Sequence, residues 1–365
     1  MNKRVLITGA TGFIGSRLVT FLVQRGYKVR AIVRATSDTA HLQRLGCELF
    51  VADLLDDRGS VVQAAADCDY VFHLAAETRA VRSKELIQRN SQSMKTLLDA
   101  AASQPVPPRL VYVSSLAAVG PSSKTEHLVE SDRRHPTSFY GKSKQACEEL
   151  AESFADQMKI AIVRPPIVLG EDDRNGLMMF ESIDRFGIHF VPGFRNRNYS
   201  AIHVDDLCRA LILVAEEGQS LEPDGRNFGN GIYFATSPEI YTFSELGRTI
   251  GQVLGRKRTW VIKVALPILW SIALFNELKA RIVRQPQYLN RDKLREAMAG
   301  SWICSGEKIK NELGFEPEKP MFDRLKEIVA GYRLKGWLQS TSEPTPTKRP
   351  EHRDQKPASR EKSYG

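Results

Sequence analysis

A glycine-rich turn separates the first apolar segment of the chain from its first helical pattern. The stretch reads VLITGATGFIGSRL and places Gly9, Gly12 and Gly15 in a G-x-x-G-x-x-G array. Glycines in such a turn let the backbone approach a pyrophosphate, whose negative charge then lies at the amino-terminal amides of the helix. Small residues also allow a helix to pack closely on a strand, but a strand before this array and a helix after it favour a dinucleotide-binding site.

Short apolar segments alternate with helical patterns over the first 165 residues. Nearly continuous apolar strands are buried on both faces of a sheet, and their alternation with helices is typical of parallel strands. The sequence therefore predicts an α/β fold with a doubly wound parallel sheet of the Rossmann type. We expect strands at 5–8, 29–33, 48–51, 70–74, 110–114 and 160–164, and helices at 12–25, 60–66, 84–103 and 138–156.

The alternation ends after Pro165, where glycine and proline become frequent. We expect residues 1–165 to form the dinucleotide-binding domain, with a return to its sheet at 199–215, and residues 166–338 to form mainly a smaller substrate-binding lobe. The tail, 339–365, has almost no apolar side chains, so burial cannot offset the entropy lost on ordering, and we expect it to be disordered.

The formal net charge of +9 is concentrated in two segments. Residues 256–296 hold ten Lys and Arg against three Asp and Glu, and the tail 339–365 holds six against four. The remainder of the chain is balanced, which argues against a nucleic-acid-binding surface. The five cysteines lie far apart without a C-x-x-C pair, which argues against a disulfide framework and a thiolate zinc site. The amino terminus leads directly into a strand rather than a signal peptide, and we expect a cytoplasmic protein.

The end of the second predicted strand indicates which dinucleotide is bound. NAD sites usually carry Asp or Glu there, roughly 20 residues after the glycines, to bind the ribose 2′-hydroxyl. In this chain Val33 and Arg34 take that place, and a guanidinium can form paired hydrogen bonds with a 2′-phosphate. NADP(H) is therefore favoured, and the alternatives are NAD(H) or an Arg34 that is only a solvated strand end. Asp53, after the third strand, is placed to meet the adenine rim or to cap the next helix.

Tyr140 and Lys144 form a Y-x-x-x-K pattern on a predicted helix, where residues i and i+4 share a face. Ser114 and Ser115 end the fifth predicted strand, at the carboxyl edge where open α/β sheets bind ligands. A free tyrosine has a pKa of about 10 and is a poor acid near neutral pH, but a neighbouring ammonium and a nicotinamide cation stabilise its phenolate. The Y-x-x-x-K pattern alone usually marks a solvated helix face. The order of glycine turn, serine pair and Y-x-x-x-K predicts that Tyr140 moves a proton and that Ser115 binds the substrate oxygen.

The chain resembles the extended short-chain dehydrogenase/reductase family, within the NAD-dependent epimerase/dehydratase superfamily. TGATGFIG, ADL, VFHLAA, VYVSSLAAVG, FYGKSK, RPPIVLG and IHVDDL follow that family's order and spacing over about the first 210 residues. The resemblance implies Ser115, Tyr140 and Lys144 as the catalytic triad. It also implies a supporting role for Asn90, although Ser93 and Met94 depart from the usual pattern after that asparagine. The cofactor-binding residues that it implies are Gly9, Thr11, Gly12, Phe13, Ile14, Gly15, Arg34, Asp53, Leu54, Ala75, Tyr140, Lys144 and Pro165.

Within the family, the VRAIVR strand and the end of the second lobe resemble the bacterial branch related to dihydroflavonol 4-reductases and 3β-hydroxysteroid dehydrogenases. This implies an NADP(H)-dependent oxidoreductase that reduces a ketone, or oxidises a secondary alcohol, on an apolar flavonoid-, steroid- or isoprenoid-like substrate. The alternative is a nucleotide-sugar 4-epimerase or dehydratase with tightly bound NAD, against which Val33 and Arg34 argue. A non-enzymatic subunit with this fold would be expected to lack Tyr140 or Lys144, and both are present.

Two histidines and four tryptophans are expected to be structural. His73 in VFHLAA is expected to pack within its strand rather than act as a base. His203 precedes Asp205 and Asp206, and the family resemblance assigns this segment to packing, so we expect no metal site there. Trp260, Trp270, Trp302 and Trp337 are expected to pack the second lobe.

An apolar run from Val264 to Phe275 is interrupted only by Ser271. A membrane-spanning helix needs about 20 such residues, so this run is too short to cross a bilayer. We expect a buried helix that forms one wall of an apolar substrate pocket. The alternative is peripheral contact of residues 261–284 with anionic lipid, because basic residues flank the run. Pairing of two copies into a homodimer is also left open.

Overall fold

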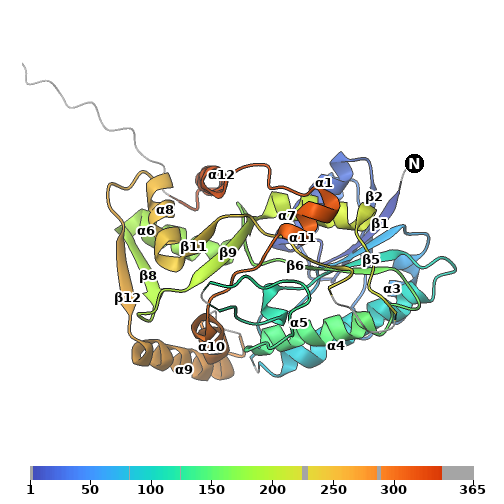
Figure 1. Cartoon of the computed structure of the whole chain (residues 1–365). Coiled ribbons are helices and arrows are strands. Elements are labelled where there is room, and N and C mark those ends of the chain that lie inside the picture. The colour runs from blue at the N-terminus through green and yellow to red at the C-terminus, as the bar shows by residue number, and fades with distance from the viewer. Residues whose placement is uncertain (1–2, 82, 124, 224–228, 286–288, 339–365) are drawn as a thin grey trace, which may run out of the picture.

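A seven-stranded parallel sheet forms the centre of the first part of the protein (Figure 1). The computed structural model describes residues 3–81, 83–123, 125–223, 229–285 and 289–338. The strand order is β10-β6-β5-β4-β1-β2-β3, and all neighbouring pairs are parallel. The strands are β1 (Arg4–Thr8), β2 (Lys28–Val33), β3 (Glu48–Val51), β4 (Tyr70–His73), β5 (Arg109–Val113), β6 (Ile160–Arg164) and β10 (Ile232–Phe234).

The strand order reverses between β1 and β4. The chain runs outward from β1 through β2 to β3, and then crosses to the other side of β1 for β4, β5 and β6. Ligands of open α/β sheets bind outside the carboxyl ends of the strands at such a reversal. The fold therefore places a binding cleft above the ends of β1 and β4.

Helices cover both faces of this sheet (Figure 1). Val5 and Ile7 of β1 point to one face, where α1 and α7 pack, whereas Leu6 points to the other, where α3, α4 and α5 pack. Burial on both faces explains why the strands are continuously apolar. The helices are α1 (Phe13–Gln24), α2 (Ala40–Arg44), α3 (Arg58–Ala65), α4 (Glu85–Ala102), α5 (Phe139–Glu152) and α7 (Val204–Glu217), and Leu116–Ala118 form the short 3-10 helix η1.

The predicted fold class is confirmed, and the expected strands and helices form close to their expected bounds. Two short elements, α2 and β10, were not expected, because five and three residues are too few to show a periodicity. The segment 199–215 returns to the sheet only through its helix, α7. Its strand, β9 (Asn198–His203), pairs instead with β7 (Ile167–Leu169) and β11 (Ile240–Thr242) in a separate sheet.

The second lobe has its own apolar core. Phe180 and Ile183 of α6 (Arg174–Phe186), Leu246 and Ile250 of α8 (Phe243–Val253) and Leu325 of α12 pack together there. A two-stranded parallel sheet of β8 (Ile188–Pro192) and β12 (Trp260–Val264) lies at its edge (Figure 1). The remaining helices are α9 (Leu266–Val283), α10 (Arg291–Ala299), α11 (Glu307–Leu313) and α12 (Met321–Leu334). The tail, 339–365, lies outside the described residues.

The expected burial of the apolar run is wrong. The run forms the first part of α9, in which Ala273 and Ala280 are buried but Ile268, Ile272 and Phe275 are exposed. Among the residues that the structure describes, no helix is long and apolar enough to span a bilayer.

The expectation for the tryptophans is also wrong in part. Trp302 is buried and Trp337 packs against the second-lobe core, whereas Trp260 is 55% exposed. Trp260 lies on the two-stranded sheet of β8 and β12, where the guanidinium of Arg258 lies 3.8 Å from the centroid of its ring.

Candidate active site

The glycine turn after β1 has the close contacts that require glycine. Gly9 has φ +75°, and a Cβ atom there would lie 2.7 Å from the amide nitrogen of Ala75. A Cβ atom on Gly15 would lie 2.1 Å from the carbonyl oxygen of Gly9. Gly12 caps α1, whose first turn has neither a side-chain cap nor an acidic residue. The amino-terminal amides of α1 are therefore available to an anion, and the turn fits a dinucleotide pyrophosphate.

A cavity of about 420 Å³ lies beside this turn and contains most of the predicted cofactor-binding residues. It is lined by the ends of β1, β2 and β4 and by the loops that follow them. The predicted residues that it brings together are Gly9, Thr11, Gly12, Arg34, Asp53, Leu54, Ala75 and Asn90. Gly15, Ile14, Lys144 and Pro165 line neither this cavity nor the substrate cavity described below.

Arg34 is exposed at the rim of this cofactor cavity, at the end of β2. Its backbone amide donates a hydrogen bond to the hydroxyl of Ser37, 3.2 Å away, and Ser37 lines the same cavity. Sequence reasoning missed Ser37, although a serine shortly after the end of a strand is a usable signal for a turn. The carboxylate of Asp53 accepts a hydrogen bond from the backbone amide of Leu55, two residues further along the chain.

Asn90 positions the loop after β4. Its side-chain amide donates to the carbonyl oxygen of Glu77 at 3.0 Å and to the hydroxyl of Ser143 at 3.1 Å, and its oxygen accepts from the amide of Glu77. Asn90 thereby joins α4 to α5 and holds the floor of the cofactor cavity. The hydrogen bonds of its side chain run to Glu77 and Ser143 rather than to Tyr140 or Lys144.

Ser115 and Tyr140 face a second cavity, of about 490 Å³, which we call the substrate cavity. Ser115 caps η1, and its hydroxyl oxygen accepts from the amide of Ala117 at 3.1 Å. Tyr140 lies in the first turn of α5, whose amino terminus is capped by Ser138. The side chains predicted to bind the substrate oxygen thus meet at one cavity.

Gly141 is what allows α5 to approach η1 so closely. A Cβ atom at this position would lie 2.3 Å from the carbonyl oxygen of Ala117. Sequence reasoning missed Gly141, although its place directly after Tyr140 in FYGKSK is a visible signal.

Lys144 lies on the same face of α5 as Tyr140 and is 3% exposed. Its ammonium donates to the carbonyl oxygen of Val113 at 2.8 Å and lies 6.0 Å from the centroid of the Tyr140 ring. An ammonium has three donors, so Lys144 can hold β5 and still direct positive charge toward the phenol.

His73 is buried within β4, as expected. Its Nδ1 lies 2.7 Å from the hydroxyl of Thr8, and its ring stacks on Tyr112. Burial, together with the positive charge of Lys144, lowers the pKa of His73 to about 3. The ring therefore stays neutral at physiological pH and belongs to the packing of the strand.

His203 caps α7 and is followed by two paired carboxylates. Asp205 accepts from Arg17 of α1 at 2.8 Å, and Asp206 accepts from Arg324 of α12 at 2.9 Å. These ion pairs connect α7 to α1 and α12, and they give each of the two carboxylates an arginine partner.

The second lobe completes the substrate cavity with apolar side chains, with Asp173 and Asn175, and with one ion pair. Lys293 of α10 pairs with Glu296 at 2.8 Å, and its ammonium lies 5.2 Å from the centroid of the Tyr140 ring. Glu296 also accepts from Ser138 at the start of α5. Sequence reasoning missed this contribution of α10, because nothing local indicates that the helix folds back onto α5. Apolar parts of the wall come from Phe13, Leu116, Ile167, Val168, Pro192, Tyr199, Phe243 and Trp302.

A neighbouring cavity of about 540 Å³ lies between α9, α10 and the start of α5. Asn276 and Glu277 of α9 and Arg291 of α10 line it, together with Phe139, which directly precedes Tyr140. The inner side of α9 thus lies close to the start of α5, the helix that carries Tyr140 and Lys144.

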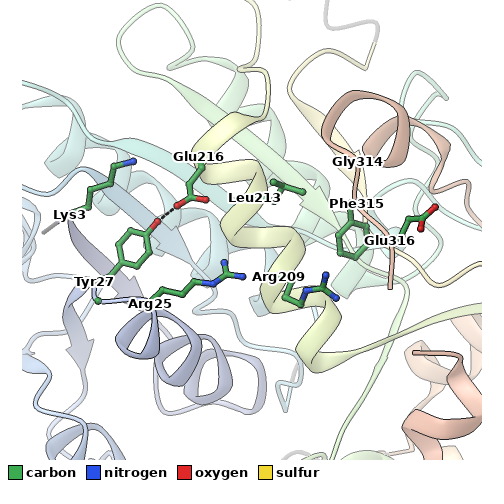
Figure 2. Close-up of a pocket in the computed structure, with 10 residues that line it drawn as sticks. Lys3, Arg25, Tyr27, Arg209, Leu213, Glu216, Gly314, Phe315 and Glu316 are labelled. Atoms are coloured by element: carbon green, nitrogen blue, oxygen red, sulfur yellow. Dashed lines mark hydrogen bonds between the residues drawn. The ribbon is translucent and has the colours of Figure 1, made fainter. Parts of the chain in front are cut away.

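A further cavity, of about 450 Å³, opens at the opposite end of the sheet (Figure 2). Lys3 and Arg25 lie around it, and the phenol of Tyr27 donates a hydrogen bond to Glu216. This cavity lies at the amino ends of the strands and contains none of the predicted site residues. The reversal of strand order and the glycine turn both place the active site at the other end.

The amino-acid sequence matches a known family over most of its first two thirds. Residues 5–229 match the NAD dependent epimerase/dehydratase family. A putative dihydroflavonol 4-reductase from Synechocystis sp. is 32% identical over 219 residues, which are 59% of this chain and 63% of the relative. A ceramide reductase from Caulobacter vibrioides is 27% identical over 341 residues, which are 92% of this chain and 96% of the relative. The chain therefore spans less than two thirds of the first relative and nearly all of the second.

A solved structure shows the same fold. The dTDP-glucose 4,6-dehydratase DesIV from Streptomyces venezuelae, with NAD bound, has a TM-score of 0.73 and 24% identity, over 92% of this chain and 99% of that one. The predicted membership of the epimerase/dehydratase superfamily is thereby confirmed, and the cofactor of the family is a nicotinamide dinucleotide.

Proposed function

The chain belongs to the NAD dependent epimerase/dehydratase family, and from this we propose that it is an NADP(H)-dependent oxidoreductase that interconverts a ketone and a secondary alcohol on an apolar substrate. The observation that carries this proposal is the substrate cavity, where Tyr140 and Ser115 lie among walls that are largely aromatic and aliphatic. Two relatives named as reductases, one of them of a ceramide, support a reductive reaction on a lipid-like molecule.

In this proposal the first lobe binds the cofactor and carries the triad, and the second lobe mainly binds the substrate. Residues 1–165 carry the glycine turn, Arg34 and the triad, while most of the substrate cavity wall comes from residues 166–338. Substrate choice then depends on the second lobe, which accounts for the wide range of reactions that one fold supports.

Arg34 and Ser37 are the residues that would hold a 2′-phosphate. Arg34 is exposed at the cofactor cavity rim, and Val33 occupies the place where a carboxylate would bind a 2′-hydroxyl. A guanidinium and a hydroxyl on one turn supply the donors that a phosphate requires.

Tyr140 donates the proton to the substrate oxygen in the reductive direction. The dinucleotide, when bound, supplies the hydride. Ser115 accepts a hydrogen bond from the amide of Ala117, so its hydroxyl proton remains free to bind the substrate oxygen. Lys144 holds positive charge near the phenol and stabilises the phenolate left after proton transfer.

Identification of the bound dinucleotide tests the proposal. One portion of the purified full chain is denatured so that any dinucleotide it releases can be identified. A second, folded portion is titrated with NADPH and NADH and then assayed with apolar ketones and with nucleotide sugars. Tighter binding of NADPH and its stoichiometric oxidation by an apolar ketone are expected. Copurified NAD that is regenerated during conversion of a nucleotide sugar would instead identify an epimerase or dehydratase.

A further inference from the structure

The helix α9 is apolar around most of its surface, and many of its large apolar side chains are exposed. Ile268, Ile272, Phe275 and Ile282 are 56%, 43%, 67% and 83% exposed. Their spacing places them on one face of the helix, together with Leu278, which is 50% exposed. We call these five residues the α9 face.

Hydrogen bonds on the inner side fix this orientation. Asn276 donates to the carbonyl oxygen of Leu289 at 2.9 Å, and Glu277 accepts from the amide and the guanidinium of Arg291. The helix cannot rotate to bury the α9 face without breaking these bonds and exposing Ala273 and Ala280.

The two-stranded sheet beside α9 also presents apolar side chains outward. Trp260 and Ile262 of β12 and Phe190 of β8 are 55%, 43% and 53% exposed. Ile262 and Phe190 are register partners, and Trp260 is two residues from Ile262, so all three lie on one face of the sheet. β12 leads directly into α9 at the end of the molecule away from the seven-stranded sheet (Figure 1).

The segment that carries most of these apolar side chains is rich in basic residues. Residues 256–284 contain seven Lys and Arg, and their single acidic residue, Glu277, is paired with Arg291. Arg256, Lys257 and Lys263 are exposed, and the guanidinium of Arg258 lies 3.8 Å from the centroid of the Trp260 ring. A tryptophan with an adjacent cation and a basic apolar helix is a combination typical of segments that lie on anionic membranes.

We propose that the α9 face, together with the outer face of β8 and β12, binds the surface of an anionic lipid bilayer. A second copy of the chain is a poorer occupant, because a two-fold interface would bring the same positive charges together. The tail 339–365 is a poorer occupant as well, because it has almost no apolar residues and a net positive charge. The helix would lie in the plane of the interface, since none of the described helices is long and apolar enough to cross.

Flotation of the full chain with vesicles tests this proposal independently of the proposed reaction. Vesicles of phosphatidylcholine mixed with phosphatidylglycerol are compared with vesicles of phosphatidylcholine alone, at low and high salt. We expect strong flotation with the anionic vesicles only, and its loss at high salt. Replacement of Arg256 and Lys257 by Gln should weaken binding about tenfold or more.

The double variant Ile272→Glu with Phe275→Glu should abolish flotation while its thermal unfolding stays like that of the original chain. The matched control is Val106→Glu with Leu334→Glu, which adds the same charge at two apolar residues that are 81% and 90% exposed elsewhere. The control should float like the original chain. Equal flotation with neutral vesicles, no flotation at all, or equal losses in both double variants would overturn the proposal. Sedimentation as a dimer that only Ile272→Glu with Phe275→Glu dissociates, without flotation, would assign the face to a second copy.

Discussion

Single side chains set the chemistry that the site can perform, and Arg34 is the one expected to select the dinucleotide. Replacement of Arg34 by Ala should weaken NADPH binding by about 1.5–3 kcal/mol, the range of a charged hydrogen bond, and leave NADH binding nearly unchanged. Fluorescence titration with both dinucleotides measures the difference. Arg44→Ala, an exposed arginine in α2, is the control and should change neither affinity. Equal losses for NADPH and NADH would mean that the 2′-phosphate binds elsewhere.

The hydroxyl of Tyr140 is expected to be needed for turnover and not for cofactor binding. Tyr140→Phe keeps the ring in the substrate cavity and removes the proton donor, so kcat should fall by about 10²–10⁴ while the Kd for NADPH stays the same. Tyr27→Phe removes a hydrogen-bonded phenol at the far cavity and serves as the control. Near-original turnover of Tyr140→Phe would exclude the proposed proton transfer.

The close approach of Gly141 to Ala117 is expected to set the position of Tyr140. Gly141→Ala puts a methyl group 2.3 Å from a carbonyl oxygen, so α5 must shift away from η1. We expect a loss of kcat with little change in NADPH affinity, and a loss of stability of about 1–3 kcal/mol from overpacking. Gly59→Ala is the comparison, because the nearest atom to a Cβ there is 3.9 Å away. A fully active Gly141→Ala would show that the contact does not position the tyrosine.

At the scale of elements, a buried ion pair connects α5 to β6 beneath the active site. Glu148 and Arg164 are almost fully buried and form two hydrogen bonds, of 2.7 and 2.9 Å, and Ser114 at the end of β5 donates to the same carboxylate. Burial raises the pKa of Glu148, but the guanidinium of Arg164 outweighs it and holds the pKa below its usual value.

Replacement of Arg164 should therefore strongly destabilise the folded chain. Arg164→Met leaves the buried Glu148 carboxylate with only Ser114 and the partly exposed Arg134 as partners, and we expect a loss of about 3–5 kcal/mol in the free energy of unfolding. Arg133→Met, at an exposed arginine, should have little effect. Urea denaturation of both variants checks this, and similar midpoints would mean that the pair contributes no more than a surface contact.

The buried His73 is expected to lower the free energy of unfolding in acid. Its pKa is about 3 in the folded chain and near 6.5 when unfolded, so between these values the unfolded chain binds the additional proton and stability falls as pH falls. This residue alone contributes a slope of up to about 1.4 kcal/mol per pH unit below its unfolded pKa. His73→Gln should flatten the pH dependence of unfolding in that window, whereas His135→Gln, at an exposed histidine, should leave it unchanged. The same slope in all three chains would contradict the buried, neutral histidine.

Local patterns predicted the elements of the first domain well, because each strand is buried on both faces and each helix covers one. Val5, Leu6 and Ile7 show this directly, since they alternate between two apolar clusters. The strand β9 shows the limit of such patterns. Its last four residues are buried like those of a central strand, but its partners are β7 and β11, which are remote in sequence or too short to recognise.

At the scale of the whole molecule, the short motifs of the first domain were predictable, and the part of the candidate site that the second lobe contributes was not. Gly9, Arg34 and Tyr140 lie in short motifs. Lys293 lies near the Tyr140 ring, and Glu296 accepts from Ser138, only because α10 folds back over the start of α5. The exposure of α9 was unpredictable for a related reason. An apolar run has the same composition whether it faces a core or the surroundings, and only the inward hydrogen bonds of Asn276 and Glu277 settle its direction.

The cavity between α9 and α10 has a consequence for how rates would depend on substrate. Its wall is the inner side of the helix whose outer side carries the α9 face, and it reaches Phe139 beside Tyr140. For a protein held on a bilayer by the α9 face, the effective concentration of a substrate dissolved in that bilayer would be its mole fraction among the lipids. Surface dilution with inert lipid should slow such an enzyme even when the total substrate is constant, whereas dilution of enzyme-bound vesicles with buffer should not.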